Sequence, residues 1–187
     1  RLASYGFLQG FYYKPRIDKE LLAQHSGGLI ALSACLKGAV PQKLLLEQPD
    51  AALAEALELR DIFGPENFYL ELQDHNLPAQ RRINPAIIEM AQKTGISLVC
   101  TNDSHYLRRE DSVAHDVLLC IGTGKVVSQP DRMRYESDQF YFKSPDEMYQ
   151  LWGHVPEAMH NTVRIAERCN LQIETTQPLP PFEVPPG

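Results

Sequence analysis

Three short apolar runs, each followed by a polar turn, constrain the fold of this chain more than any other feature. They cover residues 28–33 (GLIALS), 67–72 (NFYLEL) and 96–101 (ISLVCT). Continuous apolar runs of this length are typical of strands that are buried on both faces of a parallel sheet. Two segments with apolar residues at near-helical spacing, 49–63 and 85–93, lie between the runs. The alternation predicts an α/β protein with parallel strands and right-handed crossovers.

The pattern changes after residue 101. The elements expected there are a helix over 111–121 with the apolar stripe Val113, Val117, Leu118 and Ile121, a loop over 122–134, an extended piece over 139–142, a helix opened by a capping box at 144–147 and ending at Trp152, and a helix from Pro156 to about Cys169. We expect residues 1–176 to form one domain. The five prolines of residues 177–187 are typical of a linker between domains.

Composition narrows the class of protein. The length of 187 residues suits one domain with a sizeable core. The 24 acidic and 18 basic residues give a formal net charge of −6, which argues against a protein that holds nucleic acid mainly by neutralising phosphates. Four widely spaced cysteines predict a reduced, cytoplasmic protein without a disulfide framework. No apolar run approaches the roughly 20 residues of a membrane helix, so we expect no membrane partner.

The segment 101–106 (TNDSHY) is the most informative stretch, because it directly follows a predicted buried strand. Parallel α/β proteins build their sites at the carboxyl ends of strands. In extended backbone Asp103 and His105 point to the same side and could share one or two metal ions. The alternative is a turn in which Asp103 caps the backbone and His105 is an ordinary surface residue. Spacing alone leaves both interpretations open, with Asn102 as a further residue that could line a site.

Three more residues follow or interrupt predicted strands. Cys35 lies two residues after the first run and could be a thiolate ligand, or a small buried apolar residue. Glu71 interrupts an apolar strand, which is costly unless the carboxylate is paired, hydrogen-bonded or near a metal. A salt bridge to an arginine or exposure at a sheet edge would explain it equally. His75 also follows a predicted strand and could line the same site at the carboxyl ends of the strands, although a solvated loop histidine is the favoured interpretation.

The remaining histidines show no such pattern. His115 lies four residues after Asp111 on a predicted helix, so a local ion pair explains it. We expect the other three to lie on the surface: His25, His154 and His160.

Six ordered blocks of sequence belong together. They are residues 10–18 (GFYYKPRID), 28–38 (GLIALSACLKG), 68–75 (FYLELQDH), 100–107 (CTNDSHYL), 114–125 (AHDVLLCIGTGK) and 182–187 (FEVPPG). In this order they resemble the polymerase-and-histidinol-phosphatase (PHP) domain of the bacterial replicative DNA polymerase III alpha subunit. The resemblance covers essentially the whole chain.

The resemblance implies a distorted seven-stranded β/α barrel. In family members that keep the site, nine His, Asp, Glu and Cys side chains hold three divalent metal ions and hydrolyse phosphodiesters as a 3′–5′ exonuclease. By motif position, Cys35 is the family's cysteine ligand, and Asp103 and His105 are its late Asp-x-His pair. A thiolate ligand favours Zn²⁺ or Mn²⁺ over Mg²⁺. The family's polymerase carboxylates lie in a palm domain after the Pro-rich segment, so this chain is expected to contain no polymerase active site.

The resemblance also implies that this chain is the carboxyl-terminal portion of the domain. The amino-terminal strands and six of the nine ligands, including a His-x-His, would lie before Arg1, so we expect the chain alone to be inactive. For the parent protein the resemblance implies template-directed DNA synthesis, a nucleotidyltransferase reaction of DNA replication, with proofreading by this domain. Its implied partners are DNA, a separate exonuclease subunit and other replisome subunits. The alternatives are a non-catalytic module that braces the polymerase and docks that exonuclease subunit, or the error-prone alpha-subunit paralogue.

Overall fold

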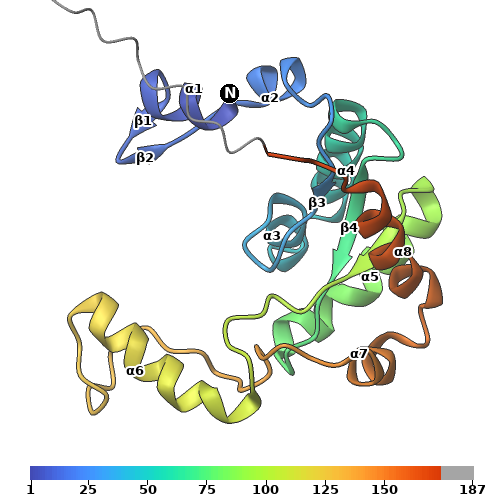
Figure 1. Cartoon of the computed structure of the whole chain (residues 1–187). Coiled ribbons are helices and arrows are strands. Elements are labelled where there is room, and N and C mark those ends of the chain that lie inside the picture. The colour runs from blue at the N-terminus through green and yellow to red at the C-terminus, as the bar shows by residue number, and fades with distance from the viewer. Residues whose placement is uncertain (174–187) are drawn as a thin grey trace, which may run out of the picture.

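A three-stranded parallel sheet forms the centre of the computed structural model, which describes residues 1–173 (Figure 1). Its strands are β3 (Ala31–Leu32), β4 (Phe68–Leu72) and β5 (Leu98–Cys100), in the order β3-β4-β5. The prediction of a mixed α/β fold with parallel strands is therefore confirmed. The linker predicted over 177–187 and the domain boundary at residue 176 lie outside the described residues.

Helices lie before, between and after these strands along the chain. They are α1 (Leu2–Leu8), α2 (Lys19–Gln24), α3 (Ala39–Leu45), α4 (Pro49–Phe63), α5 (Pro78–Thr94), α6 (Ser112–Thr123), α7 (Pro145–Trp152) and α8 (Pro156–Arg168), with the 3₁₀ turn η1 (Arg109–Asp111) before α6. A separate antiparallel pair, β1 (Phe11–Tyr12) and β2 (Lys14–Pro15), lies beside α1. No helix within residues 1–173 combines the length and the apolar character that crossing a membrane requires.

Local signals explain the helices that the sequence predicted well. Pro49 begins α4, and Gly64 ends it with a φ of 88°, a backbone angle that favours glycine. At α7 the Ser144 hydroxyl accepts a hydrogen bond from the Glu147 amide, while the Glu147 carboxylate accepts one from the Ser144 amide. This is the predicted capping box, and it satisfies two backbone N–H groups that the helix itself leaves free.

Two predicted extents are wrong. The first strand has only residues 31–32 instead of 28–33, and Leu32 is 36% exposed rather than buried. The reason is that β3 is an edge strand of the sheet. Helix α5 begins at Pro78, seven residues before the predicted start, because Pro78 occupies its first turn and Pro85 is accommodated inside the helix.

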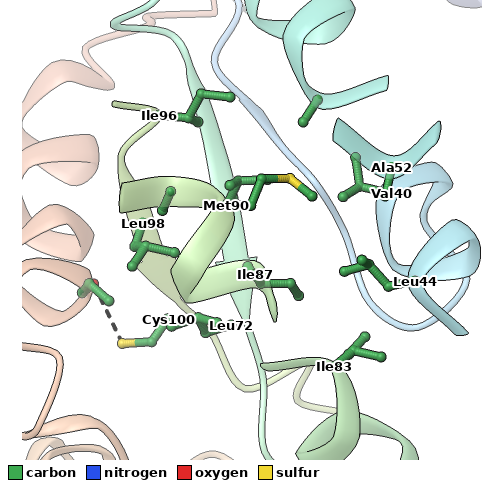
Figure 2. Packing of buried hydrophobic residues seen from close by; sticks show 14 of the residues in the cluster. Val40, Leu44, Ala52, Leu72, Ile83, Ile87, Met90, Ile96, Leu98 and Cys100 are labelled. Atoms are coloured by element: carbon green, nitrogen blue, oxygen red, sulfur yellow. Dashed lines mark hydrogen bonds between the residues drawn. The ribbon is translucent and has the colours of Figure 1, made fainter. Parts of the chain in front are cut away.

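One continuous apolar core joins the sheet to its helices (Figure 2). Alternate residues of β4, Phe68, Leu70 and Leu72, are at most 1% exposed and pack with residues of α3, α4 and α5. On the other side α8 covers β5, where the Cys100 Sγ lies 3.5 Å from the Ala158 carbonyl oxygen. Burial raises the pKa of the Cys100 thiol to about 11, so this cysteine is a packing residue.

Helix α6 lies apart from that core, at the end of the molecule toward which β4 points (Figure 1). Its apolar stripe is exposed, with Val113 and Ile121 each 73% and Leu118 62% accessible. The described residues form the parallel sheet and the β1-β2 pair, and they do not confirm the seven-stranded barrel that the resemblance implies.

Candidate functional site

Each of the three parallel strands is followed by a non-glycine residue with left-handed backbone. These residues are Ala34 after β3, Asn76 after β4 and Asp103 after β5, with φ values of 66°, 65° and 41°. Such conformations are uncommon outside glycine and cluster at functional sites. They bend the loops that carry Cys35 and His75, together with the Asp103 loop, at the carboxyl edge of the sheet, where the sequence predicted the chemistry.

Asp103 and His105 lie together as the sequence predicted. The Asp103 Oδ1 and the His105 Nε2 are 3.5 Å apart. Two ligand atoms that each lie about 2.0–2.2 Å from a tetrahedral metal ion are about 3.4 Å from each other, so the pair has the separation of two ligands to one ion. In residues 1–173 the Asp103 carboxylate accepts no backbone hydrogen bond, so the interpretation of Asp103 as a turn cap is wrong.

His105 is an exposed residue whose ring contacts other aromatic side chains. Its Nε2 lies 3.1 Å from the Tyr135 hydroxyl, and its ring centroid lies 4.8 Å from that of Tyr135 and 5.6 Å from that of Phe140. The His105 amide donates to the Phe140 carbonyl at 2.7 Å. Segment 135–140 therefore holds the imidazole in place. The sequence did not single out Tyr135, and its contact with His105 spans 30 residues.

Cys35 belongs to the same neighbourhood without completing a metal-binding group. Burial, followed by the charges of Asp103 and Cys35, raises the pKa of Tyr135, so both predicted ligands lie within electrostatic range of this phenol. Cys35 is half-buried and lines a small cavity together with Glu71 and Gln73. Within residues 1–173, however, no three His, Cys, Asp or Glu side chains meet in an arrangement that could hold a metal ion.

Glu71 is buried in a hydrogen-bonded network. It is 8% exposed and accepts hydrogen bonds from the Gln73 amide, at 3.0 Å, and from the Thr101 hydroxyl. Among the described residues it forms no ion pair, so neither a salt bridge to arginine nor edge exposure explains it. The Gln73 Oε1 is buried without a hydrogen-bond partner in the described part of the chain. Next to Cys35, the ends of the strands therefore carry the buried polar side chains of Glu71 and Gln73.

His75 is fully buried, so the favoured interpretation as a solvated loop residue is wrong. Its Nδ1 lies 2.8 Å from the Gln80 side-chain nitrogen, and its Nε2 lies 2.7 Å from the Asn102 carbonyl oxygen. The Gln80 oxygen accepts from the His75 amide, which orients the Gln80 nitrogen as donor to Nδ1 and leaves the proton on Nε2. Burial lowers the pKa of His75, the bond to Asn102 partly opposes this, and Lys143 lowers it further.

Asn102 ties the loop after β5 to the returning chain. Its side-chain nitrogen donates to the carbonyls of Tyr141 and Gln139, and its Oδ1 is buried without a partner in residues 1–173. The Phe140 ring stacks on His75 with centroids 4.1 Å apart. Asn102 and His75 thus support the loop of the Asp103–His105 pair. Both ring nitrogens of His75 take part in hydrogen bonds, whereas the Asn102 Oδ1 has no partner in residues 1–173.

His115 is a site residue that the sequence did not identify. In the described residues it makes no ion pair with Asp111, so the expected explanation is wrong. Its ring centroid lies 5.6 Å from that of His105 and 5.1 Å from that of Tyr135. Burial lowers the pKa of His115, and the neighbouring His105 lowers it further. Helix α6 therefore brings a second imidazole to the Asp103–His105 pair.

Comparison with known proteins agrees with this arrangement. A family model described as the PHP domain matches residues 1–75. DNA polymerase III subunit alpha of Treponema pallidum is 49% identical over 185 residues, which is 98% of this chain and 16% of that protein. The subunits from Borreliella burgdorferi and Thermus aquaticus are each 43% identical over 99% and 100% of this chain, and again over 16% of their own length.

These matches confirm the resemblance. Residues 1–75 are homologous to PHP domains. More particularly, the chain as a whole is homologous to a segment of DNA polymerase III alpha subunits, and it spans 16% of the length of these relatives.

Proposed function

We propose that this chain is part of the PHP domain of a cytoplasmic, replicative DNA polymerase alpha subunit. We further propose that the domain hydrolyses phosphodiesters at 3′ ends with bound divalent metal ions. The observation that carries the proposal is the 3.5 Å separation of the Asp103 carboxylate and the His105 imidazole on a left-handed loop after β5. In this proposal the β3-β4-β5 sheet is a continuous part of the family's seven-stranded barrel.

The donor set fits such metals. Asp103 offers a carboxylate, His105 an imidazole nitrogen and Cys35 a thiolate, which together favour Zn²⁺ or Mn²⁺ over Mg²⁺. Bound metal would supply an activated water and would stabilise negative charge on the phosphate. The chain's own residues orient the ligands. The Phe140 carbonyl accepts from the His105 amide, the rings of Tyr135 and Phe140 pack against the His105 ring, and the buried His75–Asn102 bond supports the loop.

A second candidate function rests on the incomplete ligand set. Because residues 1–173 bring no three ligands together, a non-catalytic module that braces the polymerase and docks a separate exonuclease subunit is the rival proposal. Both candidates place DNA and other replisome subunits among the partners of the parent protein. They differ in whether excision depends on Asp103.

Substitution of Asp103 separates the two. In a full-length alpha subunit that carries this chain, Asp103→Asn keeps the shape of the side chain and removes its charge. Excision of a mispaired 3′ end should fall by at least about 100-fold, since even residues behind metal ligands contribute about 10- to 100-fold. Primer extension should barely change. Asp50→Asn, an exposed position at the start of α4, is the matched control. Unchanged excision by the Asp103 variant, with no second exonuclease present, would refute the catalytic proposal.

A further inference from the structure

A cavity of about 350 Å³ lies between α6 and the chain that returns alongside it. Its walls are Tyr106, Ser112, Val113, His115, Asp116, Leu119 and residues Arg132, Arg134, Tyr135, Glu136, Ser137 and Asp138. The volume is in the range of sites that hold small molecules. Neither the predicted metal ligands nor their supporting hydrogen bonds account for this space.

The cavity adjoins the Asp103–His105 pair through two of its wall residues. Tyr135 and His115 both line the cavity and both contact the His105 ring, with centroids 4.8 Å and 5.6 Å away. A molecule in the cavity would therefore lie against two rings that contact His105, and a group that extended past these rings would reach the Asp103–His105 pair.

The walls favour a flat, uncharged group in the interior. Tyr106, His115 and Tyr135 provide three rings along the wall. The His115 centroid lies 5.3 Å from that of Tyr106 and 5.1 Å from that of Tyr135. The Arg132 guanidinium, with 5% of its side chain exposed, forms a bidentate pair with Asp116 at 2.6 and 2.7 Å. The negative charge of Asp116 neutralises the positive charge of Arg132. This pair therefore leaves no surplus of positive charge that would hold a polyphosphate in the interior.

Polar and charged groups also line the cavity. Arg134 and Glu136 are exposed and form no ion pair among the described residues, and Asp138 is paired with Arg109 at 2.7 Å. Ser112 and Ser137 add hydroxyl groups to the wall. Rings, hydroxyls and one available guanidinium are what a nucleotide requires: stacking for its base, hydrogen bonds for its edges and a cation for its phosphate.

We propose that this cavity binds the base of a nucleotide, with Tyr135 as the main stacking residue and Arg134 as the cation for its phosphate, which extends toward the Asp103–His105 pair. The orientation rests on the proposed function, which places phosphate hydrolysis at that pair. The substrate is then the nucleotide at the end of a nucleic acid strand, and a sugar phosphate or a free phosphate would leave the cavity empty. A nucleic acid strand whose terminal nucleotide lacks its base should be a poor substrate.

Binding of three probes to the full chain in the presence of a metal chelator tests the proposal. The probes are deoxythymidine monophosphate, deoxythymidine and inorganic phosphate, measured by titration calorimetry or by ligand-observed NMR. The monophosphate should bind most tightly and the nucleoside should bind more tightly than phosphate. Tyr135→Leu should weaken monophosphate binding about tenfold, as expected for loss of one base-stacking ring. Tyr135→Phe keeps the ring and should retain binding.

Matched variants protect this test against unfolding. Tyr149→Leu removes an exposed tyrosine of α7 outside the cavity and should leave binding unchanged. Arg134→Gln should weaken binding of the monophosphate but not of the nucleoside. Arg164→Gln, at an exposed position of α8, should weaken binding of neither. Phosphate that binds as tightly as the monophosphate, or Tyr135→Leu that behaves like Tyr149→Leu, would overturn the proposal.

The same measurements separate this proposal from the proposed function. Because no metal is present, a chain that binds the monophosphate through Tyr135 supports the cavity assignment even if Asp103→Asn leaves excision intact. Conversely, excision that requires Asp103 but not the Tyr135 ring would support hydrolysis and refute the base-binding cavity.

Discussion

Replacement of His75 tests how the buried network supports the candidate site. His75→Leu removes the acceptor for the Gln80 side-chain nitrogen and the donor to the Asn102 carbonyl, and Gln80 is itself only 3% exposed. A buried polar group without its partner costs about 1–3 kcal/mol. Two such groups, offset in part by the more apolar leucine, should lower the free energy of unfolding by roughly 2–4 kcal/mol. Urea denaturation followed by circular dichroism measures this loss.

The pH dependence of stability provides the sharper part of the test. Because burial lowers the pKa of His75 in the folded chain, the unfolded chain binds the proton more readily. The contribution of His75 to stability is therefore fully present above the unfolded pKa of about 6.5, and it decreases as the pH drops below that value. The contribution of His75 to the free energy of unfolding should therefore decrease between pH 7 and pH 5.5.

His75→Leu should lose this contribution, while His160→Leu, at an exposed position of α8, should keep the wild-type dependence. The comparison between variants isolates His75, since other histidines titrate in all of them. A pH dependence that is identical in His75→Leu and in the wild-type chain would show that the buried neutral imidazole does not contribute as described.

Two further substitutions test other parts of the fold. Gly38→Ala would place a Cβ 2.1 Å from the Ser33 carbonyl oxygen, so the Cys35 loop must shift, and thermal unfolding should occur several degrees lower than in the wild-type chain. For Glu55, burial raises the pKa of the carboxyl, but hydrogen bonds from Lys19 and Lys43 outweigh burial and lower it. Glu55→Gln should therefore cost about 1–2 kcal/mol at pH 7. This difference from the wild type should shrink as the pH falls below about 4.5 in urea titrations, because the unfolded chain is protonated first and the folded carboxylate at lower pH.

Sequence patterns predicted the elements whose ends are set by neighbouring residues. The helix over 49–63 has a proline at its start and a glycine after its end, and the structure agrees at both ends. The strand over 28–33 was overestimated because an apolar run does not reveal that its strand lies at the edge of the sheet. The spacing of Asp103 and His105 left a shared site and a turn as alternatives. The structure places the two side chains 3.5 Å apart, with Asp103 in left-handed rather than extended backbone.

The rest of the site depends on contacts between distant residues. Tyr135 and His115 reach His105 only because α6 and the chain after it fold back, and no periodicity in either segment indicates this. Burial of His75 depends on Gln80 and Phe140, which come from α5 and from the segment before α7. A single sequence contains no local signal for such contacts, which explains why a buried, hydrogen-bonded histidine was mistaken for a solvated one.

The two edges of the parallel sheet differ, and this decides how the sheet can grow. At β5 the Asn161 side chain donates to the Leu98 carbonyl at 2.7 Å, so a residue of α8 occupies a position that another strand would need. At β3 the amides of Ala31 and Ser33 point inward to β4, which leaves the backbone of Leu32 facing outward, without a strand beside it in residues 1–173. A strand from a longer chain or from a second copy can therefore add at one edge only, and its register would be set by Leu32.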